Sequence, residues 1–282
     1  MDDNTGGRRA SWPWRVAASI AGAAVLLGGC GSGDDGKAAD PSASASARST
    51  ASAASGSPSV SPTSGDAPPL TPFQADPARV PRTRQQAEAL ATAVALNPQA
   101  WGAGFRAQRP AASTPGTVAV LDEQCRWERR PLPGSVLASL SRYSEIPATA
   151  DKGELKVTAA VTVHATVRDA DEQLAATLEE PLRCREQQVR TDERIAKLMS
   201  AATPYGQGNN NYADDQVVEI GSYLTGDAEQ VYRWYVTRLG TVTLAVSVKG
   251  ATGYSNGELD KYASNANVTM LNSVRFELGG DS

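Results

Sequence analysis

Residues 156–167, KVTAAVTVHATV, alternate between two kinds of side chain. Aliphatic or small side chains occupy every second position, and mostly polar side chains occupy the positions between them. Because successive side chains of a strand point to opposite faces, this period of two predicts a half-buried antiparallel strand. The aliphatic face consists of Val157, Ala159, Val161, Val163, Ala165 and Val167.

A meander of three strands is predicted between residues 215 and 249. Thr241–Lys249 repeats the alternation, and Leu239-Gly240 suits a hairpin turn to the preceding strand. The other predicted strands are Glu229–Thr237 and Gln216–Leu224, with weaker ones near Thr117–Trp127 and Val136–Tyr143. The inward residues of the last strand are expected to be Val242, Leu244, Val246 and Val248.

Helices separate these groups of strands. Thr83 and Gln86 form the pattern of a capping box for a helix through about Leu96. Further helices are predicted from Asp169 to Pro181, from Thr191 to about Ala202, and from about Glu258 to Val274. The order of elements predicts an α+β fold, an antiparallel sheet of about five to six strands packed with helices.

The N-terminus has the pattern of an export signal. Three arginines within residues 1–15 precede an apolar run, Val16–Leu27. As a helix this run spans ~18 Å, which is short of the ~30 Å hydrocarbon core of a membrane. The following Leu-Gly-Gly-Cys, residues 27–30, resembles the lipobox of bacterial lipoproteins. We therefore expect a signal peptide over residues 1–29 and a diacylated Cys30 that anchors the protein to the outer face of the cell membrane.

The N-terminal segment is also compatible with other modes of processing and export. Cleavage without lipidation would give a secreted protein, and an uncleaved segment would give a weak membrane anchor. Arg8-Arg9 leaves the twin-arginine route open beside general secretion.

A tether is predicted between the anchor and the domain. Thirty of the forty residues 31–70 are Ser, Ala, Gly or Pro. This composition offers too little apolar surface to offset the entropy of ordering, so residues 30–70 are expected to be a disordered tether that starts at the lipidated cysteine. Its Ser/Thr-rich composition leaves O-glycosylation open. Residues 71–282 are expected to form a single extracytoplasmic domain.

The three cysteines divide between two uses. With Cys30 assigned to the lipid, Cys125 and Cys184 remain, and an even remainder in an exported domain predicts a disulfide. Two free thiols or a redox pair are the alternatives, although the chain lacks a Cys-x-x-Cys spacing. The net charge of −4 argues against a nucleic-acid partner.

No catalytic motif stands out. The chain lacks a Gly-x-Ser-x-Gly elbow, a Walker loop, a His-Glu-x-x-His pair and an EF-hand loop. His164, the only histidine, is expected on the polar surface of a strand, and neither a metal nor another cofactor is expected. The adjacent carboxylates Glu179-Glu180 and Asp214-Asp215 are expected to be solvated surface.

One loop is a candidate for binding. Tyr205 and Tyr212 frame a run rich in Gly and Asn that ends in Asp214 and Asp215. Such a loop can form the lip of a groove or stack on a sugar, and its alternative is a plain connection between two elements. Trp234 is expected in the core rather than at a ligand.

Two stretches carry a resemblance to a known family. They are VTVHATVRDADEQL, residues 161–174, which is followed by Cys184, and RLGTVTLAVSVKG, residues 238–250, which is followed by the last helix. Over roughly residues 118–275 the chain resembles actinobacterial lipoproteins whose domain is similar to the extracellular sensor domain of PknH-type serine/threonine kinases. That family typically carries two disulfides, whereas this chain has cysteines for one, and no ligand-contacting residue can be carried over. The resemblance implies an extracytoplasmic binding or sensing module.

We therefore expect a lipid-anchored envelope protein that binds an envelope ligand or protein without catalysing a reaction. The alternatives are a cell-envelope hydrolase acting through Asp214 and Asp215, and a lipid carrier with an apolar cavity.

Overall fold

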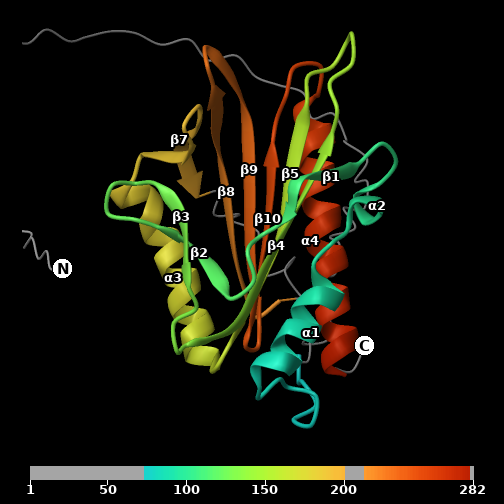
Figure 1. Cartoon of the computed structure of the whole chain (residues 1–282), viewed down its shortest axis with the longest axis vertical. Helices are drawn as coiled ribbons and strands as arrows, with labels where there is room; N and C mark the ends of the chain where they lie inside the picture. The colour runs from blue at the N-terminus through green and yellow to red at the C-terminus, as the bar shows by residue number, and fades with distance from the viewer. Residues whose placement is uncertain (1–72, 201–212, 280–282) are drawn as a thin grey trace, which may run out of the picture. The chain divides into compact units, whose positions relative to one another are not determined.

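The computed structural model describes residues 73–200 and 213–279 (Figure 1). The predicted signal peptide, Cys30, the tether, Tyr205 and Tyr212 lie outside these ranges.

The fold is α+β and antiparallel, as predicted, but the predicted number of strands is wrong. The main sheet has eight strands in the order β1-β4-β5-β10-β9-β8-β7-β6, and β2 and β3 form a separate hairpin. The strands are β1 Arg106–Ala112, β2 Thr117–Leu121, β3 Trp127–Pro131, β4 Val136–Ile146, β5 Leu155–His164, β6 Glu186–Arg190, β7 Glu193–Ser200, β8 Asp215–Thr225, β9 Ala228–Leu239 and β10 Val242–Lys249.

The last strand of the chain joins two halves of the sheet. All eight residues of β10 are in register with β5 on one side and with β9 on the other. The predicted meander of β8, β9 and β10 is confirmed, with the turn at Gly240 between β9 and β10. β10 therefore connects β1-β4-β5 to β9-β8-β7-β6.

The aliphatic core lies on one face of the sheet. It is covered by α1 Arg84–Val94 and α4 Asn256–Leu278, with the short α2 Pro98–Trp101 beside them. The predicted inward residues of β10 are 0% exposed, as are Val161 and Val163 of β5. Capping boxes at Thr83 and Ser255 start α1 and α4, because each cap residue and the third residue of its helix satisfy each other's backbone N–H groups.

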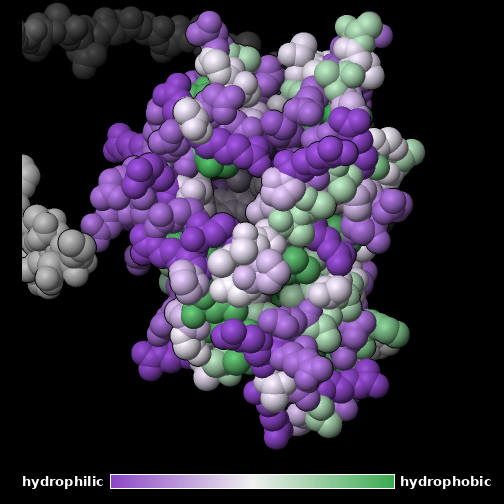
Figure 2. Space-filling model, in the orientation of Figure 1, coloured by the Kyte–Doolittle hydropathy of each residue, from purple (hydrophilic) through white to green (hydrophobic). Residues whose placement is uncertain are grey.

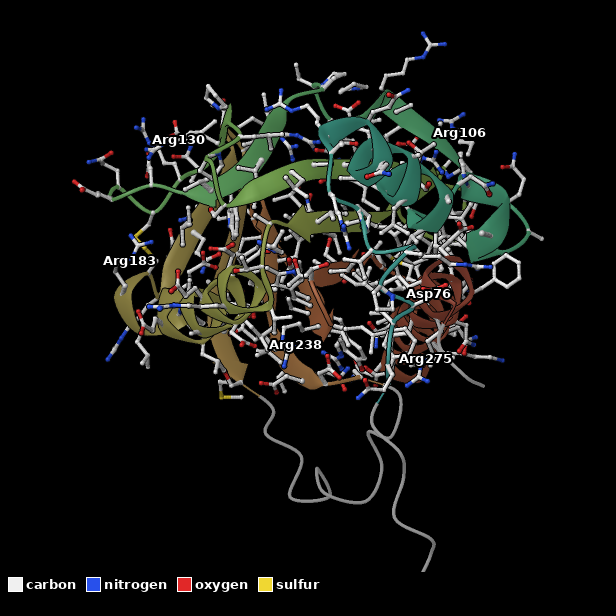
Figure 3. All side chains as sticks on the ribbon, turned by 90° about the horizontal axis from the view of Figure 1, so that it is seen from below. Asp76, Arg106, Arg130, Arg183, Arg238 and Arg275 are labelled. Atoms are coloured by element: carbon white, nitrogen blue, oxygen red, sulfur yellow. A yellow bond between two sulfur atoms is a disulfide. The ribbon has the colours of Figure 1, made fainter. Side chains whose placement is uncertain are left out.

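The opposite face of the sheet carries α3 Val167–Arg183. Figure 3 shows Arg183 of α3 and Arg275 of α4 on opposite sides of the domain, with the strands between them. Thr166 Oγ1 accepts a hydrogen bond from Asp169 N at 3.1 Å and so caps α3. Because of this cap β5 ends at His164, and the predicted inward positions of Ala165 and Val167 are wrong. The helix also continues past Pro181, where its end was predicted, to Arg183.

Two other predicted elements differ from the structure. The predicted helix from Thr191 to Ala202 is wrong, since β6 and β7 form a hairpin there, and Ile195 packs with Tyr223 and Tyr232. The strand predicted near Thr117–Trp127 is divided by a turn. That turn forms because Asp122 Oδ1 accepts hydrogen bonds from two backbone N–H groups that follow it. No helix within the described ranges is long and apolar enough to cross a membrane.

Candidate functional site

The β2–β3 hairpin, residues 117–131 and called the strap below, extends across the second face of the sheet. It lies against β4 at one side and β6 at the other. Arg129 of the strap donates to Ser141 Oγ of β4 at 3.2 Å. At the other side, Gln188 N of β6 donates to Cys125 O at 2.8 Å. The strap therefore connects strands that are far apart in the order of the sheet.

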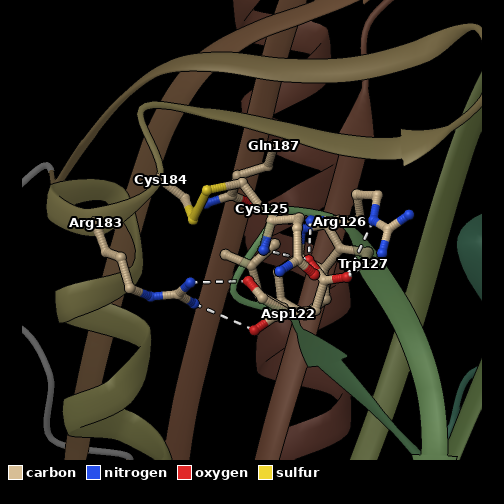
Figure 4. The surroundings of a disulfide bond; sticks show 9 residues. Asp122, Cys125, Arg126, Trp127, Arg183, Cys184 and Gln187 are labelled. Carbon is tan, nitrogen blue, oxygen red and sulfur yellow. Dashed lines mark hydrogen bonds and ion pairs between the residues drawn. A yellow bond between two sulfur atoms is a disulfide. The ribbon is translucent and has the colours of Figure 1, made fainter. Parts of the chain in front are cut away.

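A disulfide joins the strap to the end of α3 (Figure 4). Cys125 and Cys184 have Cα atoms 5.5 Å apart, so the predicted disulfide is confirmed. Arg183 adds two hydrogen bonds, to Asp122 O at 2.8 Å and to Leu121 O at 3.2 Å. The last turn of α3 and the strap are thus connected covalently and by a charged hydrogen-bond donor.

A buried ion cluster shows how strongly the sheet curls. Glu193 of β7 accepts from Lys156 of β5 at 3.0 Å, from Arg190 at 2.8 Å and from Lys249 of β10 at 2.7 Å. Burial alone would raise the pKa of Glu193, but these cations outweigh burial and lower it to about 2. Because Glu193 reaches over to β5 and β10, the face below the strap is concave.

One row of side chains crosses the concave face. Glu219, Trp234, Ser247, Thr158 and Tyr143 are neighbours in register across β8, β9, β10, β5 and β4. Apart from Glu219 these side chains are only partly buried, whereas Val246 and Val248 on the opposite face are 0% exposed. Figure 2 shows a hollow over β8, β9 and β10, rimmed mainly by hydrophilic residues. Along this row, called the cleft below, the concave face is therefore incompletely covered, whereas elsewhere it buries two small apolar clusters, one around Leu174 and Val236 and one around Ile195.

Two tryptophans meet in this cleft. The rings of Trp127 from the strap and Trp234 from β9 pack edge to face, with centroids 5.7 Å apart. Trp127 Nε1 donates to Gln187 Oε1 at 2.8 Å, and Gln187 is 0% exposed. Trp234, which was predicted to be a core residue, is partly buried and packs against two apolar clusters of the concave face, around Leu174 and around Ile195.

Glu180 of α3 and Glu219 of β8 each carry a buried carboxyl oxygen. Burial raises the pKa of Glu219 on β8 to about 7, and the charge of Glu180 on α3 raises it further. Burial also raises the pKa of Glu180 to about 7, against the opposing effect of Arg183. One oxygen of each group, Oε2, is buried without a hydrogen-bond partner among the described residues. The prediction that Glu180 is a solvated surface residue is wrong, because the last turns of α3 direct it toward the sheet.

His164 lies under α3 rather than on the surface where it was predicted. It is 3% exposed, and its Nε2 lies 2.7 Å from Gln173 Oε1 and 3.1 Å from Thr243 Oγ1. Burial lowers the pKa of His164, which favours the neutral ring. Its partners are the side-chain amide of Gln173 on α3 and the hydroxyl of Thr243 on β10. His164, at the end of β5, therefore connects the helix with these two strands.

Asp214 and Asp215 lie at the start of β8. Asp214 Oδ2 accepts from Arg238 Nη1 at 2.9 Å and from Gly240 N at 2.7 Å. Asp215 Oδ1 accepts from Gln216 N at 2.8 Å. Asp214 thus binds the β9–β10 turn, and Asp215 binds the backbone at the start of β8.

The described ranges contain another place of a size suited to a small ligand. A separate cavity of about 330 Å³ lies between α2 and α4, lined by residues such as Trp101 and Tyr262. Within residues 73–200 and 213–279, no three His, Cys, Asp or Glu side chains gather as a metal would require.

Similar folds are found among solved structures, whereas no similar sequence is found. No family model matches it, and no curated protein matches it in sequence. It is similar to the extracellular domain of PknH from Mycobacterium tuberculosis. The TM-score is 0.43 and the identity 12%, over 67% of this chain and 97% of that domain.

A second similar structure is an uncharacterised protein from Mycobacterium smegmatis, the Rv0999 ortholog. Here the TM-score is 0.32 and the identity 10%, over 70% of this chain and 97% of that one. The PknH domain is also the kind of domain whose pattern the sequence resembles. At these scores the similarity is modest, and the proposals below rest on the residues of this chain.

Proposed function

We propose that this chain is a non-enzymatic, membrane-anchored extracytoplasmic protein that binds a ligand or partner in the cleft beneath the strap. The observation that carries the proposal is the row from Trp234 to Tyr143, which stays partly exposed beneath a strap attached at both sides. The rest of this face buries apolar side chains around Leu174 and around Ile195, so the row is where its packing is left open.

The groups in the cleft indicate the kind of ligand. Trp234, which contacts Trp127, has Ser247 as its neighbour in register, and Thr158 and Tyr143 continue the row on the next two strands. Aromatic faces with a few oriented polar groups suit a small polar molecule that also has an apolar face. A fragment of a cell-wall glycan has this character. The lipid-carrier alternative receives no support, because the Val and Leu side chains are packed against α1 and α4.

Tryptophan fluorescence of residues 71–282 tests the binding proposal. Titration with soluble cell-wall glycan fragments should change the emission saturably, and Trp234→Ala should abolish the change. Trp101→Phe is the matched control, because Trp101 lies beside α4 on the other side of the sheet. Equal responses in both variants, or no saturable response in the wild type, would contradict binding in the cleft.

We also propose that Cys30 carries the lipid anchor and that residues 31–70 separate the domain from the membrane. The lipobox-like sequence at residues 27–30 supports the anchor, and the low-complexity composition supports the tether. Cys30→Ala should move the protein from the membrane fraction to the soluble fraction with the domain still folded. Retention of the variant in membranes would count against lipidation.

A further inference from the structure

A cavity lies between α2 and α4, on the side of the sheet away from the cleft. The two helices are in contact, and Figure 1 shows them side by side. The cavity volume of about 330 Å³ is that of a site for a small molecule. Trp101, Tyr262 and Ala266 line it with apolar surface, and Glu258 and Lys261 add charged groups. It therefore offers a ligand both an apolar surface and charged groups.

Phe105 holds the two aromatic side chains of the cavity in place. Its ring centroid lies 5.8 Å from that of Trp101 and 5.3 Å from that of Tyr262, and it meets Tyr262 edge to face. Phe105 is itself buried in the aliphatic core. Because one buried ring contacts both, the apolar wall is formed before any ligand binds, and little affinity is lost to ordering it.

Trp101 carries a hydrogen-bond donor without a partner. The residue is 7% exposed, and its Nε1 is buried without an acceptor among the described residues. A buried indole N–H normally has a partner, because a donor removed from water otherwise loses a hydrogen bond. Trp127 follows this rule, since its Nε1 donates to Gln187 Oε1. An acceptor on a ligand in the cavity can supply what Trp101 lacks.

The charges around the cavity favour an anion. The carboxylate of Glu258 lies 3.0 Å from Lys152 Nζ, which neutralises it. Asp260, next to Lys261 in sequence, forms an ion pair with Arg233. Lys261 itself is exposed and has no ion-pair partner among the described residues. The uncompensated charge at the cavity is therefore positive.

We propose that this cavity is a binding site for a small aromatic carboxylate. The ring of the ligand packs against Tyr262 and Ala266, and its carboxylate accepts a hydrogen bond from Trp101 Nε1. Lys261 adds electrostatic attraction from the exposed edge of the cavity. The site is separate from the cleft, so the proposal goes beyond the function proposed above and does not depend on it.

Proton–nitrogen NMR of residues 71–282 with benzoate as the probe tests the site. These residues contain three tryptophans, and Trp101→Phe assigns the indole signal of Trp101 by removing it. Millimolar benzoate should shift this signal saturably, whereas the indole signals of Trp127 and Trp234 should not move. Benzylamine has the same ring with a positive charge, and acetate has the carboxylate without the ring, so neither should reproduce the shift.

Two variants measure the contribution of each polar group, with the backbone amide signal of Ala266 as the readout. Trp101→Phe keeps an aromatic ring but removes the N–H, and it should weaken benzoate binding about tenfold. Lys261→Gln should weaken binding by up to about fivefold, as expected for an exposed charge. Lys197→Gln is the charge control, because Lys197 pairs with Glu229 outside the cavity and should leave the affinity unchanged.

Three results would overturn the proposal. The first is a Trp101 indole signal that does not respond to benzoate, and the second is a response to benzylamine as large as that to benzoate. The third is an unchanged benzoate affinity in Trp101→Phe. If Trp101→Phe does not fold, Trp127→Phe and Trp234→Phe assign the indole signals, and the three probes on the wild type decide.

Failure of this site and failure of the cleft can be told apart. The glycan titration is read from Trp234 in the cleft, and the benzoate titration from Trp101 on the other side of the sheet. Benzoate binding without glycan binding would support the cavity alone. Glycan binding without benzoate binding would overturn the cavity site and leave the proposed function intact.

Discussion

Lys156 Nζ and Glu193 Oε1 lie 3.0 Å apart, although β10, β9 and β8 separate their strands in the order of the sheet. An ion pair across three intervening strands requires a strongly curled sheet. Together with Lys249, it fixes the curvature on which the cleft depends.

Removal of the anion in this cluster should therefore destabilise the domain. Glu193→Gln leaves the buried Lys249 without its carboxylate partner and should lower the free energy of unfolding by about 3 kcal/mol. Urea denaturation measures the loss. Glu186→Gln, which breaks an exposed pair with Arg194, is the control and should cost less than about 1 kcal/mol. Equal effects of the two variants would show that the cluster does not fix the curl.

Loss of the disulfide should weaken the domain and loosen the strap. Cys125 and Cys184 are 59 residues apart in sequence, and closing such a loop stabilises by roughly 4 kcal/mol in the chain-entropy model. The double variant Cys125→Ser/Cys184→Ser should show a lower Tm in calorimetry, and its Tm should not respond to dithiothreitol. A wild-type Tm that is also unaffected by full reduction would contradict this role.

The stability of the domain should depend on pH in two opposite ways. Glu180 and Glu219 have raised pKa values, so their contribution is complete below pH 4.5 and is lost as the pH rises to about 7. Glu193 has a lowered pKa, so its contribution is present above pH 4.5 and is lost as the pH falls to about 2. Urea titrations between about pH 5 and pH 8 should show a decline in the wild type. The decline should be shallower in Glu219→Gln, and parallel curves for the two proteins would contradict the raised pKa of Glu219.

Gly250 follows β10 at a place with no room for a side chain. A Cβ atom there would lie 2.6 Å from Val231 O, to which Gly250 N donates at 2.7 Å. Gly250→Ala should cost about 1–3 kcal/mol of unfolding free energy, because the backbone of β9 or β10 must shift. Gly257→Ala, in the first turn of α4, meets nothing within 4 Å and should be neutral or slightly stabilising in the same denaturation assay.

Elements with strong local patterns were predictable from the sequence. β5 and β10 alternate over most of their length, and Thr83 and Gln86 mark the start of α1 through neighbouring residues alone. β1 and β6 carry no such pattern, because edge strands need only backbone hydrogen bonds on one side; β1 has no large aliphatic residue, and β6 consists largely of polar residues. Their existence depends on contacts with β4 and β7, which no local window contains.

In the candidate site, only the disulfide could be predicted from the sequence. An even number of cysteines outside the lipobox was enough to pair Cys125 with Cys184. The burial of Glu180 depends on how α3 packs on the sheet, so no spacing in the sequence reveals it. One signal was present nevertheless. Glu219 shares a strand face with the buried Val217 and Tyr223, where a carboxylate is out of place unless it has a specific environment.

The position of β10 has a consequence for the way the chain becomes a folded molecule. Until residues 242–249 are available, β5 and β9 each present an unpaired edge lined by residues such as Val161 and Val236. Synthesis that stops early, or a protease cut before residue 242, therefore leaves two incomplete half-sheets with adhesive edges rather than a smaller folded domain. The sheet is therefore completed only when β10 pairs with β5 and β9. The unpaired edges of these two strands distinguish an incomplete chain from a complete one, and proteases can recognise them.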